Sequence, residues 1–302
     1  MRVKYDDETK LIFQIGDPID HVCAAALHNA MYEIANLNAV CTLVKVEKGE
    51  LPAFIEAAKT IGAWGFYITM PHKGDIIPFL DECDEASRVF HCVNHVKIRD
   101  GKLIGIGQDG MGMGLAIESA LGKGNVKGKR VLMIGAGAVS GPIAADLCAK
   151  GASAVYIVNR TEERARYIAQ TLHELYGIET AFGILENKTL CRFAPQVDIA
   201  VQCTSAGLGG SKKLYFPLDF IADLPPHCLL ADTQYPRTPY LDTGKERGLK
   251  CVNGMKMLLW QMLAMVDYQF GVTLDESCLK LAEDALTATV AVRDLKLRRR
   301  EE

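Results

Sequence analysis

Residues 131–141, VLMIGAGAVSG, constrain the fold of this chain most tightly. An apolar strand runs into Gly135-Ala136-Gly137, and an alanine-rich helix is expected over residues 138–150. Glycine at such a turn lets the backbone approach a pyrophosphate, and the free N–H groups of the following helix favour the phosphates. Ser140, or Ala138 in a shifted register, stands where the usual fingerprint has its third small residue, so the match is to a variant. The pattern favours a dinucleotide site over a plain strand–helix turn.

The end of the next expected strand indicates which dinucleotide is bound. This strand, over residues 154–158, leads into Asn159-Arg160-Thr161, and Arg164 follows one helical turn later. NAD enzymes usually place Asp or Glu here to bind the ribose hydroxyls. Arginine instead suits bidentate contacts to phosphate, and NADP carries a 2′-phosphate at this point. The sequence therefore predicts NADP, with a surface arginine beside a capping threonine as the alternative.

Short apolar runs alternate with segments of helical period along the chain, which is typical of α/β architecture. Strands are expected at residues 11–15, 40–46, 65–70, 130–134, 154–158, 197–202, 228–232 and 250–253, with a hairpin over 93–104. Helices are expected at residues 23–37, 53–61, 109–121, 138–150, 162–176, 255–270 and 275–297. We expect an N-terminal α/β substrate domain over residues 1–108, completed by helices within 255–302. A Rossmann-type, doubly wound NADP-binding domain is expected over 109–254, with a cleft between the two.

Composition and charge exclude several classes of function. The net charge of −3 argues against a nucleic-acid-binding surface. No apolar run is long enough for a membrane span, and the charged N-terminus does not resemble a signal peptide. Ten cysteines lie in apolar runs without a CxxC pair, as expected for a reduced, cytoplasmic protein. The spacing of Cys83, His91, Cys92 and His95 fits no common zinc pattern, so no metal is expected.

Several further motifs occur in order along nearly the whole chain. They are Gly16-Asp17-Pro18-Ile19 with His21 and His28-Asn29, the run from Gly65 to Lys73 (GFYITMPHK), Val93-Asn94, Gln108-Asp109-Gly110-Met111-Gly112, Cys203-Thr204-Ser205-Ala206-Gly207, and Gly254-Met255-Lys256-Met257-Leu258 with Gln261. Together with the glycine loop, they resemble the shikimate/quinate dehydrogenase family. The resemblance implies an NADP-dependent alcohol dehydrogenase that interconverts a cyclic polyol and its ketone, such as shikimate and 3-dehydroshikimate, in aromatic amino acid biosynthesis.

The resemblance also implies a catalytic pair, Lys73 and Asp109. Oxidising an alcohol requires a base for the hydroxyl proton, and the reverse reaction requires an acid. A lysine with an ordinary pKa of about 10.4 is a poor base at neutral pH, but partial burial lowers that pKa. We expect Lys73 to carry the proton and Asp109 to orient Lys73 and the substrate hydroxyl. The alternatives are an exposed lysine at a helix start and a helix-capping aspartate.

The remaining site residues are implied in the same way. Substrate contacts are expected from Thr69, Asn94 and Gln261, with Tyr67 and Tyr235 as further candidates. Met257 is expected near the nicotinamide. The full set of expected cofactor contacts is Gly135, Ala136, Gly137, Ala138, Val139, Asn159, Arg160, Thr161, Arg164, Thr204, Ser205, Ala206, Gly254 and Met257.

Departures from the family pattern concentrate at the substrate. The family's His-Ser-x-Ser-Pro run, whose two serines hold the shikimate carboxylate, is represented here by His21, Val22, Cys23 and Ala24. Loss of two hydrogen bonds to a charged group would weaken carboxylate binding by roughly 3–6 kcal/mol, or about 10²- to 10⁴-fold in affinity, if nothing replaced them. Tyr67 and Gln108 could supply replacement donors.

Three hypotheses about function follow. The first is a shikimate dehydrogenase or close paralogue. The second is a family member acting on quinate, an aminated analogue or another ring polyol. The third is a non-catalytic dinucleotide-binding sensor, which the presence of both Lys73 and Asp109 disfavours. The sequence is consistent with a monomer or a homodimer.

Overall fold

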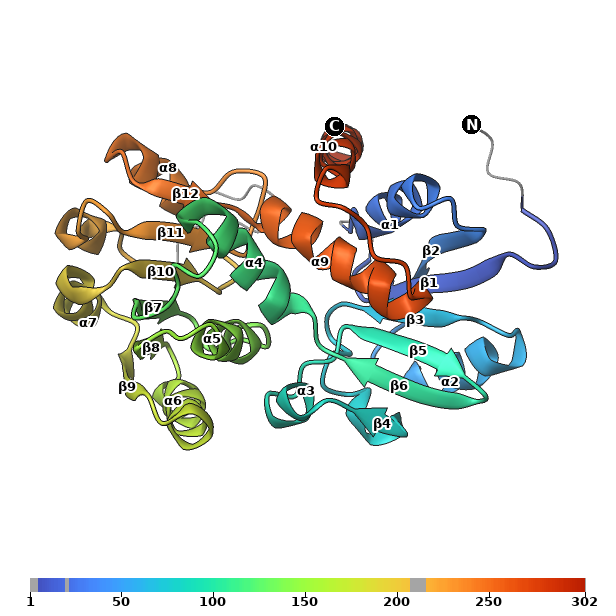
Figure 1. Cartoon of the computed structure of the whole chain (residues 1–302), viewed down its shortest axis with the longest axis horizontal. Coiled ribbons are helices and arrows are strands. Elements are labelled where there is room, and N and C mark those ends of the chain that lie inside the picture. The colour runs from blue at the N-terminus through green and yellow to red at the C-terminus, as the bar shows by residue number, and fades with distance from the viewer. Residues whose placement is uncertain (1–4, 20–21, 207–215, 302) are drawn as a thin grey trace. The chain divides into compact units, whose positions relative to one another are not determined.

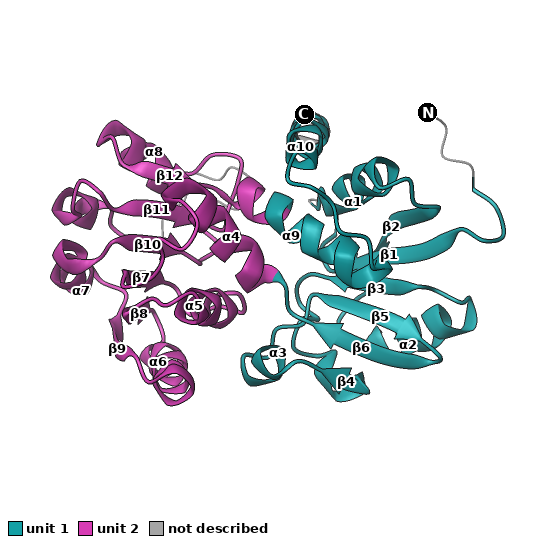
Figure 2. Ribbon diagram, viewed as in Figure 1, with its two compact units in different colours: residues 1–108, 259–302 teal, residues 109–258 magenta. Residues whose placement is uncertain are grey.

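The computed structural model describes residues 5–19, 22–206 and 216–301, with side chains up to residue 295. The chain divides into two compact units, one of residues 1–108 and 259–302 and the other of residues 109–258 (Figure 2). The second unit ends at residue 258, so the boundary between the units falls within helix α9 (Gly254–Phe270). Each unit contains one six-stranded sheet.

The sheet of the second unit is entirely parallel. Its strands are β7 (Arg130–Ile134), β8 (Ala154–Asn159), β9 (Glu179–Ile184), β10 (Ile199–Gln202), β11 (Leu229–Asp232) and β12 (Lys250–Val252). Their order is β12-β11-β10-β7-β8-β9, so the direction of winding reverses between β7 and β10 (Figure 1). This is the Rossmann order, in which a dinucleotide binds at the carboxyl ends of the strands at the reversal point.

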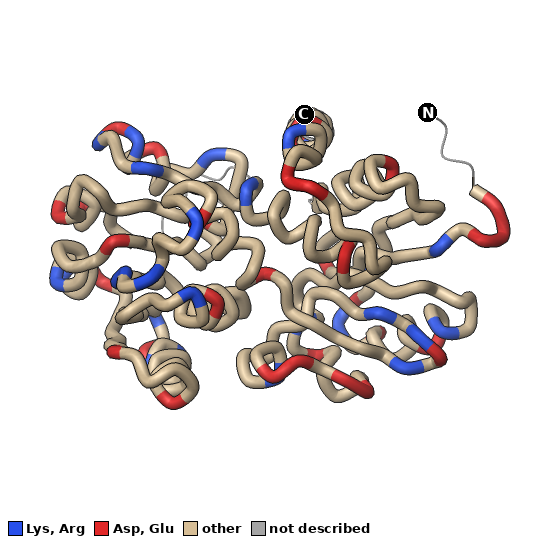
Figure 3. Tube along the Cα trace, viewed as in Figure 1, with Lys and Arg blue, Asp and Glu red and all other residues tan. Residues whose placement is uncertain are grey.

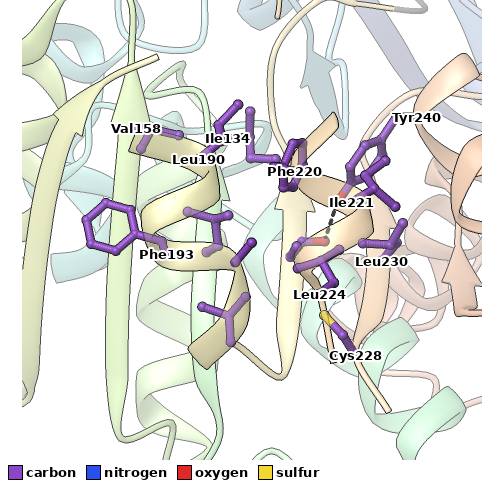
Figure 4. Close-up of a cluster of buried hydrophobic side chains, with 14 of the residues drawn as sticks. Ile134, Val158, Leu190, Phe193, Phe220, Ile221, Leu224, Cys228, Leu230 and Tyr240 are labelled. Carbon is purple, nitrogen blue, oxygen red and sulfur yellow. Dashed lines mark hydrogen bonds between the residues drawn. The ribbon is translucent and has the colours of Figure 1, made fainter. Parts of the chain in front are cut away.

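Helices cover both faces of this sheet, which explains why its strands are continuous apolar runs. They are α4 (Asp109–Leu121), α5 (Ser140–Ala149), α6 (Glu162–Tyr176), α7 (Asn187–Phe193) and α8 (Pro239–Glu246), with short 3₁₀ helices η2 (Ala194–Gln196) and η4 (Asp219–Asp223). One face packs strand residues such as Ile134 and Val158 against Leu190, Phe220 and Tyr240 (Figure 4). The buried Tyr240 hydroxyl donates to the Ala200 carbonyl at 2.9 Å.

The sheet of the first unit is mixed. Its strands are β1 (Lys10–Gly16), β2 (Ala39–Lys45), β3 (Gly65–Ile68), β4 (Glu82–Cys83), β5 (His95–Arg99) and β6 (Lys102–Ile106). The order is β2-β1-β3-β5-β6-β4. The parallel strands β1, β2 and β3 are followed by the expected β5–β6 hairpin, whose turn residues Asp100 and Gly101 both have positive φ.

Two different environments cover this first sheet. On one face, Ile15, Phe66, Ile68 and Val96 pack against α2 (Leu51–Thr60) in an apolar core. The other face carries Tyr67 and His95, directly paired across β3 and β5. Helix α1 (Ala24–Ile34) packs here through Tyr32, whose ring meets Phe270 of α9. Helix α10 (Cys278–Glu301) contacts α1, and α3 (Glu85–Val89) and η1 (Ile77–Phe79) complete the unit.

Several expectations about local structure were wrong. Helix α5 begins at Ser140 rather than at residue 138, and α1 covers residues 24–34 rather than 23–37. The short elements β4, α3, β9, α7 and α8 were not predicted. Among the described residues, no helix is both long and apolar enough to span a membrane, and no group of three or more metal-ligating side chains occurs.

Candidate active site

The glycine loop is shaped by its contact with the end of β10. Gly135 has φ of +105°, a region that favours glycine. A Cβ atom there would lie 2.8 Å from the Thr204 Cγ2 atom and 3.1 Å from the Thr204 nitrogen, so no side chain fits. Ser140, in the first turn of α5, is buried and donates from its hydroxyl to the Gly135 carbonyl at 2.7 Å. The variant residue of the fingerprint therefore braces the loop.

Two arginines follow β8, Arg160 directly after the strand and Arg164 in the first turn of α6. Asn159 accepts from the Ala136 N–H at 3.1 Å and donates to the Thr161 carbonyl at 2.9 Å, so it ties the glycine loop to this strand end. Arg160 and Arg164 are exposed, and neither forms an ion pair within the described part of the chain. Thr161 occupies the N-cap position of α6, but its side chain makes no capping hydrogen bond.

Buried amide and carboxyl groups hold the loop after β10. Gln202 donates to the Ala206 carbonyl and to Asp232 Oδ1, both at 3.0 Å, and accepts from the Thr204 N–H. The Thr204 hydroxyl oxygen accepts from the Ala206 N–H at 3.1 Å. Burial raises the pKa of Asp232 to about 7. These bonds fix Thr204, Ser205 and Ala206 at the carboxyl end of β10, while Gly207 lies outside the described residues.

The start of α9 is held equally closely. A Cβ atom on Gly254 would lie under 3.0 Å from the Thr233 carbonyl oxygen, and the Gly254 N–H donates to the Gln234 carbonyl at 3.1 Å. Gln234 in turn donates to the Thr204 carbonyl at 3.1 Å. Tyr235 is half-buried beside Gly254, and Met257 is buried one turn along the helix.

In the first unit, the lysine motif forms a turn after β3. The Thr69 N–H donates to the Ile15 carbonyl at 2.9 Å and extends the β1–β3 ladder by one residue. His72 is fully buried, with its Nε2 atom 2.7 Å from the Val46 carbonyl oxygen. The Lys73 carbonyl accepts from the Val93 N–H at 2.9 Å. The backbone of the half-buried Lys73 is therefore anchored beside Asn94, which begins the hairpin.

A chain of hydrogen bonds fixes Asn94 and Gln108. The Gln108 N–H donates to Asn94 Oδ1 at 2.9 Å. The His95 ring lies between two glutamines, with Nδ1 2.9 Å from the Gln108 amide and Nε2 2.7 Å from the Gln269 amide. Gln269 also donates to the Trp64 carbonyl at 2.9 Å, which sets its amide orientation.

The protonation state of the His95 ring follows from its burial and these hydrogen bonds. Burial lowers the pKa of His95 to about 4, so the ring is neutral and has one N–H. Gln269 presents its oxygen to Nε2, which therefore donates, and Nδ1 accepts from an N–H of Gln108. The Gln108 amide must therefore turn its NH2 group toward Nδ1, because hydrogen bonding decides which end of an amide is the nitrogen. One amide donor of Gln108 is thus committed to His95.

Tyr67, a candidate substrate contact, lies inside the first unit. Its hydroxyl is 2.8 Å from the Tyr32 hydroxyl, and its ring stacks on His28 with centroids 3.6 Å apart. All three side chains are buried. Sequence reasoning missed Tyr32 as a partner of Tyr67, although Ala24, His28 and Tyr32 repeat at four-residue intervals on one face of α1.

Asp109 begins helix α4 and is buried. It is the first helical residue rather than the residue before it, which disfavours the N-cap alternative. The next residue, Gly110, packs against α5, because a Cβ atom there would lie under 3.0 Å from the Pro142 carbonyl oxygen. Gln261 is buried on α9 in the first unit.

Comparison with known proteins identifies the family. The sequence model of the shikimate dehydrogenase substrate-binding domain matches residues 14–96, and that of shikimate/quinate 5-dehydrogenase matches residues 117–208. The shikimate dehydrogenase (NADP(+)) of Lysinibacillus sphaericus is 36% identical over 262 residues, covering 85% of this chain and 91% of the relative. That of Methanococcus aeolicus is 32% identical, covering 92% and 98%.

Solved structures agree with these sequence matches. A shikimate dehydrogenase in complex with NADP+ superposes with a TM-score of 0.84 at 28% identity, covering 95% of this chain and 98% of that one. The ligand-free 5-ketofructose reductase of Gluconobacter sp. strain CHM43 gives a TM-score of 0.82 at 27% identity, covering 94% and 99%. This chain therefore belongs to the shikimate dehydrogenase family of NADP-dependent oxidoreductases.

Proposed function

We propose that this protein transfers a hydride between NADP(H) and a secondary alcohol of a small polyol, with Lys73 and Asp109 as the catalytic pair. The observation that carries the proposal is the combination of the glycine loop at the β7–β10 reversal point with Arg160 just after β8 and Arg164 in the first turn of α6. Curated relatives over 30% identical across most of the chain are named as NADP(+) enzymes.

The residues of the second unit fit NADP. Gly135 lets the loop pack closely against Thr204 with a positive φ, as a tight turn at a pyrophosphate site requires, and the N-terminus of α5 follows the same loop. Arg160 and Arg164 are two exposed guanidinium groups suited to a 2′-phosphate. Thr204, Ser205 and Ala206, held by Gln202, would line the ribose and nicotinamide, with Gly254 and Met257 beside them. When bound, NADP supplies the hydride acceptor or donor.

The protein's own contribution is control of the substrate proton. In alcohol oxidation, the Lys73 amine accepts the hydroxyl proton, and in reduction the ammonium group returns it. Asp109 orients the lysine and the hydroxyl, and Thr69, Asn94 and Gln261 would hold the other hydroxyls. The Val93 N–H anchors the backbone of Lys73, and the Gln108 N–H holds the Asn94 side chain. Proton and hydride transfer require such defined positions.

Lys73→Ala tests this assignment. We expect NADPH binding, followed by quenching of nicotinamide fluorescence, to stay within about threefold of the wild type, while kcat falls by about 10²-fold or more because the proton carrier is lost. Lys48→Ala, an exposed lysine of the same unit, is the matched control. Normal turnover by Lys73→Ala would show that the proton is carried elsewhere.

A second candidate, within the same reaction class, is a substrate other than shikimate. The relatives include shikimate dehydrogenases, and one structural neighbour is named as a reductase of 5-ketofructose. The absence of serines at positions 22 and 24 favours this possibility. Assays of NADP+ and NAD+ reduction with shikimate, quinate and other polyols would separate the two. Binding of NADPH without turnover of any polyol would support the sensor hypothesis instead.

The cellular setting is also a proposal. All ten cysteines are free thiols, in keeping with a reducing compartment such as the cytoplasm. A monomer and a homodimer remain the two proposed oligomeric states, which sedimentation analysis would distinguish.

A further inference from the structure

We infer that the substrate held by the first unit carries no carboxylate and is an uncharged polyol or ketose. This inference rests on the proposed hydride-transfer function. Its basis is the set of side chains packed between α1 and the first sheet, next to the positions that hold the acid in the resembled family. Val22 and Ala24, at the start of α1, are half-buried and have no hydroxyl groups.

The side chains behind these positions are neutral. Ala24, His28 and Tyr32 share one face of α1, and His28 and Tyr32 meet Tyr67 of β3. Burial holds the pKa of His28 well below its ordinary value and raises those of both tyrosines, so none of the three is charged near neutral pH. The Tyr67 hydroxyl, the expected replacement donor for a carboxylate, is instead paired with Tyr32.

Apart from Lys73, three basic side chains of the first unit, Lys45, Lys97 and Arg99, have other partners. Lys97 lies over the Tyr268 ring at 3.9 Å, and Arg99 lies over Trp64 and donates to the Gln269 carbonyl at 2.8 Å. Lys97 pairs with Gly65, the first residue of β3, so Lys97 lies at the end of β3 opposite to Thr69. Figure 3 shows Lys and Arg positions along the β5–β6 hairpin. Lys45 is exposed and paired with Glu47 at 2.7 Å.

Among the residues that the structure describes, Arg293 of α10 is the buried guanidinium near α1 and therefore the rival anchor for an acid. Its side chain is 8% exposed and lies 2.7 Å from Asp294, so the pair has no net charge. Cys23 lies between Val22 and Ala24. Burial raises the pKa of its thiol, and the charge of Arg293 partly opposes that rise. An acid bound there would have to compete with Asp294.

His28 favours a hydroxyl over a carboxylate. Among the described residues, neither ring nitrogen has a hydrogen-bond partner, and both atoms are buried. A neutral imidazole has one donor and one acceptor. A sugar hydroxyl can pair with either nitrogen, because it can donate to the one or accept from the other, whereas a carboxylate can only accept. The N–H groups at the start of α1, which Cys23 does not cap, can serve a neutral oxygen equally well.

The test compares shikimate with its methyl ester, which keeps the ring and reacting hydroxyl but lacks the charge. Reduction of NADP+ is followed at the nicotinamide band, together with myo-inositol and sorbitol, and oxidation of NADPH is followed with fructose and 5-ketofructose. We expect the ester or a neutral compound to exceed shikimate in kcat/KM by tenfold or more. Shikimate exceeding all neutral compounds by tenfold would overturn the inference.

Variants locate the determinant. Val22→Ser with Ala24→Ser should raise the ratio of shikimate to ester kcat/KM at least tenfold, and Val22→Ala, which adds space but no hydroxyl, should leave that ratio within threefold. A selective loss of shikimate turnover in Arg293→Met would place an acid on the guanidinium and overturn the inference. Lys73-dependent turnover of shikimate alone would refute the inference and leave the proposed function standing, whereas no turnover of any compound would remove both.

Discussion

Replacing Gly110 by alanine should damage catalysis through a one-atom change in helix packing. The added Cβ atom would approach the Pro142 carbonyl oxygen to under 3.0 Å, with the carbonyl carbon also too close. Because carbon atoms in contact prefer separations of about 3.5–4.0 Å, α4 must move by about 1 Å relative to α5. Overpacking of this kind costs about 1–3 kcal/mol, offset by up to about 1 kcal/mol of helix propensity. Asp109 is the preceding residue and moves with Gly110.

We expect kcat/KM to fall about 10²-fold, the usual penalty for a 1 Å misplacement of a catalytic group. NADPH affinity should change little, since the glycine loop is braced by Ser140 and Asn159. Gly114→Ala is the matched control, because its Cβ would meet the Asp146 carboxylate, a side-chain end that can rotate away. Steady-state kinetics and thermal unfolding measure both effects. Wild-type kcat/KM in Gly110→Ala would refute the view that this contact positions Asp109.

Three further predictions concern other parts of the site. Tyr67→Phe should lower the free energy of unfolding by about 1–3 kcal/mol, because the buried Tyr32 hydroxyl loses its partner, while the double change of both tyrosines to phenylalanine should recover much of that loss in urea titrations. Arg160→Gln should raise KM for NADP+ at least tenfold and leave that for NAD+ nearly unchanged, and equal effects on both would contradict a 2′-phosphate contact. Burial raises the pKa of Asp232 from 3.8 to about 7, so the folded protein binds this proton more tightly than the unfolded chain, and the free energy of unfolding should fall as pH rises between these values. Asp232→Asn should flatten this pH dependence, and an unchanged dependence would assign it to other groups.

The strands could be predicted from the sequence where both of their faces are buried. Strands β7, β8, β10 and β11 are buried on both faces and therefore are uninterrupted apolar runs in the sequence. Strand β9 lies at the sheet edge, and its residues are half-exposed, so neither an apolar run nor strict alternation marks it. Helix α7 has seven residues, too few to establish a helical period. Short and edge elements were missed for this reason.

The candidate site divides in the same way. Gly135, Lys73 and Asp109 stand in local motifs, so the sequence alone could single them out. Their supports could not be predicted, because each partner comes from a distant segment. Gln269 lies 174 residues from His95, and Gln202 lies 30 residues from Asp232. The only local signal was a polar residue at the end of an apolar run, as in Gln202 and Asp232, and its partner is set by strand order.

Amino-acid substitutions have different consequences in the two units, and the difference decides whether cofactor binding or substrate choice can vary. In the second unit, the cofactor loops are shaped by backbone contacts at Gly135 and Gly254, where any Cβ atom would collide with a neighbouring strand end. A substitution there would displace the loop itself. In the first unit, Ala24 lies on helix α1 and Tyr67 on strand β3, and Val22 comes two residues before α1. The backbone hydrogen bonds of the helix and the strand do not depend on these side chains. Exchanging serine for valine there alters the chemistry offered to a substrate without moving Lys73. Substrate class can therefore shift while the cofactor loops keep their shape.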